Sequence, residues 1–313
     1  MEQRGSFFFS AMLAGMAMLS ANTALAAADE AVVAEEVVAV VETEDADDPN
    51  TGALSISFDN SFTTAYMFRG IMNERDGLIW QPSIDLSFNV FEADEGVVQS
   101  VDLGIGTWLS VHSEDTFASG SGPDALYEAD YYPSLSISWA GGVTSAVTYY
   151  FYTSPNGAFR TVEEIVVDLS YDDSELLGAF AMYPTASFAF ETQRSSFGGS
   201  GKGAVFELGL EPGTEVSISE DYPIAITVPI ALALSMDDYY KNGPENDTFG
   251  YAMIGLHAGI PLAFVPPRYG DWSITNGFDV YFLSDTVHEY TKDTFGMGDT
   301  VYPVWTSSLT LAY

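Results

Sequence analysis

One arginine and seven carboxylates are the residues of this sequence whose types and positions could act together. The carboxylates fall in segments where apolar residues alternate with small polar ones, Arg69 directly follows such a segment, and each of the eight shares the parity of the polar set. Because alternate residues of a strand point to opposite faces, we expect all of them on one polar face. A set of carboxylates on an enclosed face favours cations and repels anions. They are Arg69, Asp59, Asp85, Asp102, Glu164, Asp168, Glu207 and Asp279.

The competing interpretation is that these acids line no open path. Arg69, Arg160 or other groups would then neutralise some of the acids, and side chains would fill a narrow interior. Arg69 stands out because the chain has nine Lys and Arg against 45 Asp and Glu. A buried arginine needs carboxylate partners, for which Asp85 or Asp76 is the expected choice. Arg69 would either tune a pore or clamp the loop that follows its segment, and the sequence leaves both roles open.

Catalytic and metal chemistry find little support in the sequence. Hydrolysis would need a histidine beside a nucleophile, with a third group orienting the histidine. His112 and His288 are expected in loops and His257 on the inward face, so we predict no catalytic residue and no cofactor. Acids in the expected loops could bind Ca²⁺, but their spacing is loose, so we predict solvated loops and no metal site. These loop acids are Glu114, Asp115, Asp124, Asp237, Asp238, Glu245, Asp247, Asp293 and Asp299.

The elements that position these residues are β-strands with one apolar and one polar face. After the first twenty-odd residues no stretch of 18 apolar residues occurs, which argues against membrane-spanning helices. The second face of the segments carries Ser, Gly, Ala and Thr with few Lys or Arg, which is typical of a barrel with lipid outside and a polar lumen inside. In the first segment the apolar set is Leu54, Ile56, Phe58, Phe62, Tyr66 and Phe68.

Twelve such segments predict an all-β protein, a closed antiparallel transmembrane β-barrel with up-and-down topology. Membrane burial forbids unpaired edges, so the sheet must close. Short and long gaps alternate, as periplasmic turns and extracellular loops do, which places both termini in the periplasm. The region 211–222 could add a strand, so ten or fourteen strands are also compatible. The segments are 53–68, 78–91, 97–111, 127–139, 143–152, 162–171, 179–190, 203–211, 223–236, 249–262, 271–284 and 301–313.

The two ends of the chain differ from the strand region in composition. Residues 1–26 have the Arg4, apolar and Ala24–Ala26 pattern of a cleaved signal peptide. Residues 27–50 hold nine acids and no base, which favours a disordered periplasmic segment over a docked helix. The barrel is therefore expected over 51–313. Its last segment ends on the aromatic Tyr313, which predicts recognition by the barrel-assembly machinery.

A resemblance to a known family enters at Ser61 to Phe88. This stretch resembles the TorF-type porin family, which begins with an aromatic-x-aromatic-Arg-Gly element followed by a Gln-x-x-x-Asp strand. A weaker resemblance covers Tyr251 to Leu262, whereas the acidic segment and the stretches 112–126 and 285–300 depart from the family. The resemblance implies an outer-membrane barrel more than any particular solute. The matching residues are Tyr66, Phe68, Arg69, Gly70, Gln81 and Asp85.

Together these features predict a porin-like outer-membrane channel for passive diffusion of small hydrophilic solutes or ions, with a preference for cations. The net charge of −36 leaves no basic surface for nucleic acid. The alternative is a structural or adhesive barrel with a closed lumen. The expected partners are outer-membrane lipid and small solutes or cations. The solute, the pore radius and the oligomeric state do not follow from the sequence.

Overall fold

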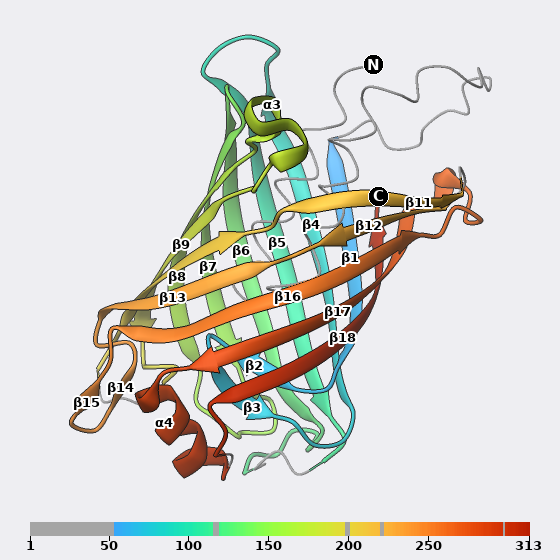
Figure 1. Ribbon diagram of the computed structural model, residues 1–313. Helices are drawn as coiled ribbons and strands as arrows, with labels where there is room; N and C mark the ends of the chain where they lie inside the picture. The colour runs from blue at the N-terminus through green and yellow to red at the C-terminus, as the bar shows by residue number, and fades with distance from the viewer. Residues whose placement is uncertain (1–52, 115–118, 198–200, 220–221, 297) are drawn as a thin grey trace.

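The computed structural model shows a closed antiparallel barrel of twelve strands, which confirms the predicted fold class (Figure 1). It describes residues 53–114, 119–197, 201–219, 222–296 and 298–313, so the predicted signal peptide and acidic segment lie outside the described residues. Each strand pairs with its neighbour in the chain, and β1 (Leu54–Thr63) pairs with β18 (Val301–Ala312) to close the ring. Both ends of the barrel domain therefore lie at the same rim, as expected.

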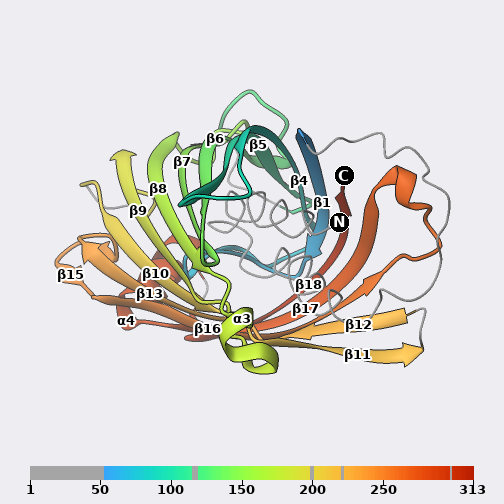
Figure 2. The same ribbon diagram turned by 90° about the horizontal axis from the view of Figure 1, so that it is seen from above.

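The remaining wall strands follow in chain order around the barrel. They are β4 (Ile79–Glu92), β5 (Val98–His112), β6 (Leu126–Trp139), β7 (Val143–Thr153), β8 (Val162–Tyr171), β9 (Thr185–Gln193), β10 (Ala204–Leu210) with β11 (Gly213–Ser219), β12 (Tyr222–Thr227) with β13 (Ile230–Asp237), β16 (Phe249–Pro261) and β17 (Asp271–Leu283). Most of the longer loops join them at one end of the barrel. At the end where β1 starts and β18 finishes, which faces the viewer in Figure 2, the connections are shorter except for the one between β8 and β9.

Two prolines explain why the region 211–222 is ambiguous in the sequence. β10 and β11 form one wall strand interrupted at Pro212, and β12 and β13 form the next, interrupted at Pro229. A proline cannot donate to the strand ladder, so each interruption falls where a ladder bond would be lost. The Val228 N–H still donates to the Pro212 carbonyl at 2.9 Å, which keeps the two interrupted strands together. The count therefore stays at twelve.

The two faces of the wall carry the residues that their parity predicts. Outward side chains such as Ile105 and Leu256 are 55% and 57% exposed. Inward side chains such as Ser83, Asp102 and Thr148 are buried. This reverses the order of a soluble protein, in which large apolar side chains lie inside. Among the described residues, no helix is long and apolar enough to cross a membrane.

Three sequence expectations about element boundaries are wrong. The predicted strand 53–68 ends at Thr63, and residues Tyr66–Phe68 form a separate strand, β2, which pairs with β3 (Ile71–Glu74). The predicted strand 179–190 begins only at Thr185, because α3 (Ser174–Leu177) and the 3-10 turn η1 (Gly178–Phe180) precede it.

The third concerns the stretch 285–300, which was expected as a loop. It contains the helix α4 (Asp285–Phe295), whose first turn is capped by the Ser284 side chain accepting from the Val287 N–H. The alternating pattern of strands carries no information about such helices between them. A two-residue ladder, β14 (Lys241–Asn242) with β15 (Glu245–Asn246), and the turn η2 (Pro267–Tyr269) complete the described elements.

Candidate functional site

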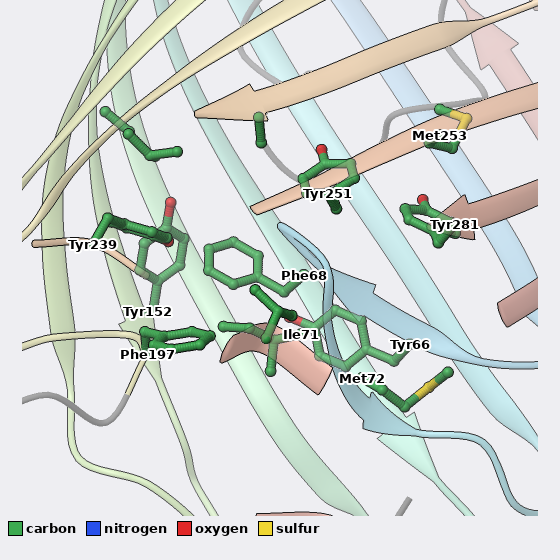
Figure 3. Close-up of a cluster of buried hydrophobic side chains, with 14 of the residues drawn as sticks. Tyr66, Phe68, Ile71, Met72, Tyr152, Phe197, Tyr239, Tyr251, Met253 and Tyr281 are labelled. Atoms are coloured by element: carbon green, nitrogen blue, oxygen red, sulfur yellow. The ribbon is translucent and has the colours of Figure 1, made fainter. Parts of the chain in front are cut away.

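The candidate site is a hairpin that fills the barrel at its long-loop end. We call residues 66–74, which comprise β2, its turn and β3, the plug hairpin. Its side chains Tyr66, Phe68, Ile71 and Met72 are all buried and contact the inner wall (Figure 3). The Tyr66 ring lies 5.4 Å from the Trp108 ring of β5. Apolar burial of this extent makes the plug hairpin part of the packed interior.

The plug hairpin corrects the predicted placement of two aromatic residues. Tyr66 and Phe68 were expected to face lipid near the membrane interface, but they point into the barrel. The parity argument failed because the chain leaves the wall at Thr64 and Ala65, so the alternation of β1 does not continue into β2. Phe68 instead lies edge-on to Tyr152 of β7, with 5.5 Å between ring centres. The hairpin thus spans from β5 to β7.

The turn of the plug hairpin consists of Arg69 and Gly70, both in the left-handed backbone region. Their φ angles are +46° and +82°. Two-residue hairpin turns with two positive φ angles favour Asn-Gly, because an arginine Cβ is strained there. An ideal Cβ on Gly70 would lie 3.0 Å from the Tyr251 Cβ of β16, so the tip is pressed against the wall. A strained arginine at this position needs compensating contacts.

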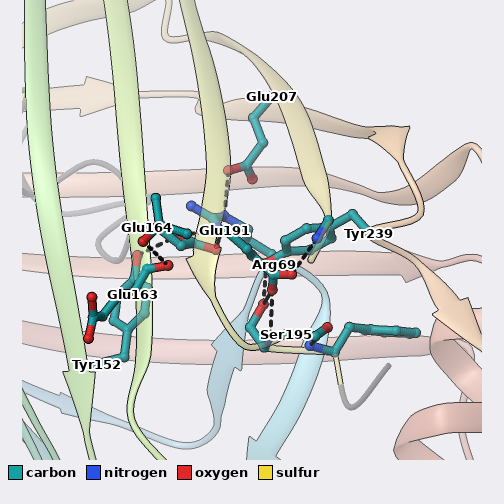
Figure 4. A network of polar contacts seen from close by, with 12 residues as sticks. Arg69, Tyr152, Glu163, Glu164, Glu191, Ser195, Glu207 and Tyr239 are labelled. Carbon is teal, nitrogen blue, oxygen red and sulfur yellow. Dashed lines mark hydrogen bonds and ion pairs between the residues drawn. The ribbon is translucent and has the colours of Figure 1, made fainter. Parts of the chain in front are cut away.

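Those contacts are two carboxylates of the barrel wall (Figure 4). Arg69 Nη1 donates to both oxygens of Glu164 at 2.8 Å, and Arg69 Nε donates to Glu207 Oε2 at 3.2 Å. The side chains of Arg69 and Glu164 are 1% and 0% exposed, whereas that of Glu207 is 16% exposed. One positive charge therefore meets two negative ones in a dry place, where the loss of one partner is costly.

Tyrosines complete the surroundings of the guanidinium. Tyr152 donates to Glu164 Oε2 at 3.0 Å and Tyr251 donates to Glu207 Oε1 at 2.6 Å, so each carboxylate has a further donor. The Tyr239 hydroxyl accepts from Arg69 Nη1 at 2.9 Å, and its ring centre lies 5.5 Å from the guanidinium carbon. We call Glu164, Glu207, Tyr152, Tyr239 and Tyr251 the wall cradle. The wall cradle is an acidic and aromatic receptor for a planar cation.

Loops at the same end cover the plug hairpin from outside. α4 packs on β3, and its Val287 is fully buried. Phe197, from the loop after β9, stacks on Tyr290 of α4 with 4.4 Å between ring centres. Glu191 accepts from the Ser196 hydroxyl at 2.7 Å, which fixes the start of that loop. The long-loop end of the barrel is therefore closed by side chains.

The predicted partners of Arg69 are wrong. Its side chain lies inside the barrel, but it reaches there from the turn of the plug hairpin and not through the parity of a wall strand. Asp85 and Asp76 do not reach it; its partners are Glu164 and Glu207, which were predicted as separate pore-lining acids. The sequence could not show this pairing because Glu164 and Glu207 lie 95 and 138 residues from Arg69 in the chain. The geometry favours the clamp interpretation, in which Arg69 holds the first loop.

The other predicted acids also face the interior, but they do not form one ring. Asp102 accepts from Asn89 at 3.0 Å and from Ser100 at 3.1 Å, Asp279 contacts His257 Nε2 at 2.9 Å, and Asp59 accepts from Thr310 at 3.0 Å and from Ser61. Asp85 packs beside Tyr132 over Gly106 of β5. The register places Asp168 and Glu207 level with each other, both opposite Ser187.

Two of the histidines lie elsewhere than the sequence suggested. His112 ends β5, where its Nε2 lies 2.7 Å from Ser110 Oγ and its ring stacks on Tyr127. His288 lies in α4, whereas His257 faces inward as predicted. The Ser110–His112 pair is fully buried beneath the plug hairpin, so a substrate would not reach it in this structure.

Sequence reasoning missed the tyrosines of the wall cradle and Glu191. Tyr152, Tyr251 and Glu191 have inward parity on β7, β16 and β9, so the alternation pattern could have found them. Tyr239 lies after β13 in a loop, where no periodic signal exists. Its role depends on the three-dimensional approach of the plug hairpin.

Comparisons with known proteins give only distant likenesses. No family model matches the chain, and no curated protein matches its sequence. Among solved structures, the chain is similar to the β-domain of the Bordetella autotransporter BrkA (10% identity, 83% of this chain and 98% of that one, TM-score 0.38). It is also similar to the NanC porin (10% identity, 82% and 98%, TM-score 0.42) and to an outer membrane channel from Pseudomonas putida F1 (10% identity, 87% and 100%, TM-score 0.41). Such low scores carry no functional conclusion, and the resemblance to TorF-type porins stays a prediction.

Proposed function

We propose that the chain is an outer-membrane barrel that acts as a porin-like channel for passive diffusion of small hydrophilic solutes or ions, with a preference for cations. The observation that carries this proposal is the inner wall, where eight of the described strands (β1, β4, β5, β6, β8, β9, β10 and β17) each carry an inward acid. Passive diffusion needs a polar path and a concentration gradient, but no cofactor and no catalytic step.

The outer surface supports a place in a membrane. Large apolar side chains point outward along the wall strands. Contact with the hydrocarbon of a lipid bilayer is more favourable for these side chains than contact with water. Ring closure between β1 and β18 leaves no wall edge open there, as a lipid environment demands. Export through a cleaved signal peptide at residues 1–26 and assembly in the outer membrane belong to the same proposal.

The balance of charge inside the barrel supports cation preference. Glu164 and Glu207 neutralise Arg69, so Asp59, Asp102 and the other wall acids set the sign of the electrostatic potential in the lumen. Fixed negative charge in a narrow path lowers the energy of a permeating cation and raises that of an anion. The loops and turns add further acids, since the whole chain carries −36.

Conductance in planar bilayers tests this function. We expect stepwise currents with a reversal potential that shifts toward the cation equilibrium value under a KCl gradient. The double substitution Asp59→Asn and Asp102→Asn should reduce that shift. Glu175→Gln on the exposed helix α3 is the matched control and should leave the shift unchanged. A reversal potential at the anion value would contradict cation preference.

A second candidate, a structural or adhesive barrel with a closed lumen, is favoured by the plug hairpin. Its four apolar side chains are each 8% exposed or less, so within the described residues the plug hairpin fills the interior at the long-loop end. This function predicts no current from the intact protein or from variants that weaken the plug hairpin. The absence of current in all these bilayer measurements would therefore favour the closed barrel.

A further inference from the structure

We propose that the wall cradle is a binding site for guanidinium-bearing or ammonium-bearing solutes, and that Arg69 occupies it as a built-in competitor that keeps the plug hairpin closed. This inference rests on the proposed channel function and adds to it the class of solute and the means of opening. A solute of this class would displace Arg69, release the plug hairpin and enter the lumen.

The first argument is the chemistry of the wall cradle itself. Glu164 is fully buried and presents both its oxygens to one nitrogen of the guanidinium, while Glu207 takes another. The Tyr239 ring supplies a π-face, with its ring centre 5.5 Å from the guanidinium carbon. Carboxylates around a planar cation with aromatic faces are the features that recognise guanidinium groups.

The second argument is that the two sides of the contact come from separate elements. The carboxylates belong to β8 and β10, which are paired strands of the closed wall. Arg69 belongs to a hairpin that is covalently joined to the wall at its two ends and is otherwise held by side-chain contacts, such as the hydrogen bond from Tyr66 to Glu128 at 2.8 Å. Without Arg69, the wall cradle would hold the buried Glu164 and the partly buried Glu207 with no positive partner, so either a proton or a cation from elsewhere would stabilise it.

The third argument is the strain at the tip. Arg69 has a φ of +46°, a backbone conformation in which asparagine before glycine is less strained than arginine. The turn alone thus disfavours arginine, and the contact with the wall cradle compensates for it. Arg69 Nη2 is buried without a hydrogen-bond partner, so the fit of this side chain is incomplete. A free solute can orient its N–H groups independently of the chain, whereas the tethered Arg69 side chain leaves Nη2 without a hydrogen-bond partner.

The test uses Arg69→Asn, which removes the guanidinium while supplying the residue that the turn favours. Met72 of the plug hairpin is 1% exposed, and the chain has no cysteine, so Met72→Cys reports opening through its reaction with a water-soluble maleimide. We expect labelling to be faster by about tenfold or more in the Arg69→Asn background, because the main electrostatic hold is lost. Arg75→Asn is the matched control, since its ion pair with Asp299 is exposed, and it should leave labelling unchanged.

Guanidinium chloride at a low millimolar, non-denaturing concentration is the probe for the empty wall cradle. We expect it to raise the unfolding temperature of the Arg69→Asn variant, whereas equal NaCl or urea should not. Adding Glu164→Gln should abolish this effect. Labelling that stays slow in Arg69→Asn, or a guanidinium effect no larger than that of NaCl, would overturn the proposal.

Conductance separates this inference from the proposed function. If Arg69→Asn opens the plug hairpin and guanidinium binds but no variant conducts, the wall cradle stands and the channel function fails. If the variants conduct but guanidinium neither binds nor blocks, the channel stands and the solute class is wrong. Conduction by Arg69→Asn that millimolar guanidinium blocks supports both.

Discussion

Arg69 shows how a tertiary contact overrides a local preference at the scale of one residue. The turn at positions 69 and 70 favours Asn-Gly, yet the chain places an arginine there because the guanidinium reaches Glu164. From the sequence, Arg69 was recognisable as a rare cation of inward parity. Its partners were not, because they depend on how far the hairpin reaches across the lumen.

Gly70→Ala tests the tight contact of the tip with the wall. The new Cβ would lie 3.0 to 3.2 Å from the Tyr251 side chain, at a φ of +82° that L-residues rarely adopt. We expect the free energy of unfolding to fall by about 1 kcal/mol or more, measured by urea titration in detergent micelles. Gly201→Ala is the control, since no atom of the described residues lies within 4 Å of a Cβ added there. Equal stabilities of the two variants would mean that the tip is not pressed on Tyr251.

At the scale of elements, strands were predictable and the pieces between them were not. Eleven of the twelve predicted segments begin within about two residues of a wall strand, because a period of two survives wherever one face is apolar. The exception, 179–190, starts in the turn η1, which lacks that period. α4 was missed because it packs on the plug hairpin and the loops, so its sequence lacks the period of two. The plug hairpin was missed for a different reason: Tyr66 and Phe68 continue the apolar parity of β1, although the chain has left the wall before them.

The contact between the β14–β15 turn and α4 should depend on pH. The pKa of Glu245 is raised, because it shares a hydrogen bond with Glu289 and is repelled by the charges of Glu289, Asp247 and Asp285. A raised pKa in the folded state means that the shared proton stabilises this contact below the ordinary glutamate pKa, and that the stabilisation is lost as the pH rises through the raised value.

Hydrogen exchange of the α4 amides measures that dependence. After correction for intrinsic exchange rates, we expect higher protection factors near pH 4 than near pH 7. Glu245→Gln should flatten the difference, because glutamine keeps a donor at every pH. Glu175→Gln, at the other end of the barrel, should not. Protection factors that rise with pH in the native chain would show that the predicted direction of the pH dependence is wrong.

At the scale of the whole molecule, the closing strand β18 joins the first and last parts of the barrel. It pairs with β1 from Thr306 to Ala312 and with β17 from Val301 to Ala312. Tyr313 extends the first ladder, since its N–H donates to the Ile56 carbonyl at 2.8 Å and its carbonyl accepts from the Ile56 N–H at 2.7 Å. These are backbone contacts, so they do not require the aromatic side chain.

Tyr313→Ala therefore separates folding from recognition by the assembly machinery. The backbone bonds to Ile56 survive this substitution, so refolding of purified protein into micelles should proceed to the same heat-modifiable form. In cells, we expect the amount of folded barrel in the outer membrane to fall several-fold, because the terminal aromatic signal is lost. Tyr131→Ala on β6 is the control, since it removes another outward tyrosine, which is 54% exposed. If both variants assembled equally well in cells, the ring of Tyr313 would be only one more outward side chain, and closure by β18 would rest on its ladder alone.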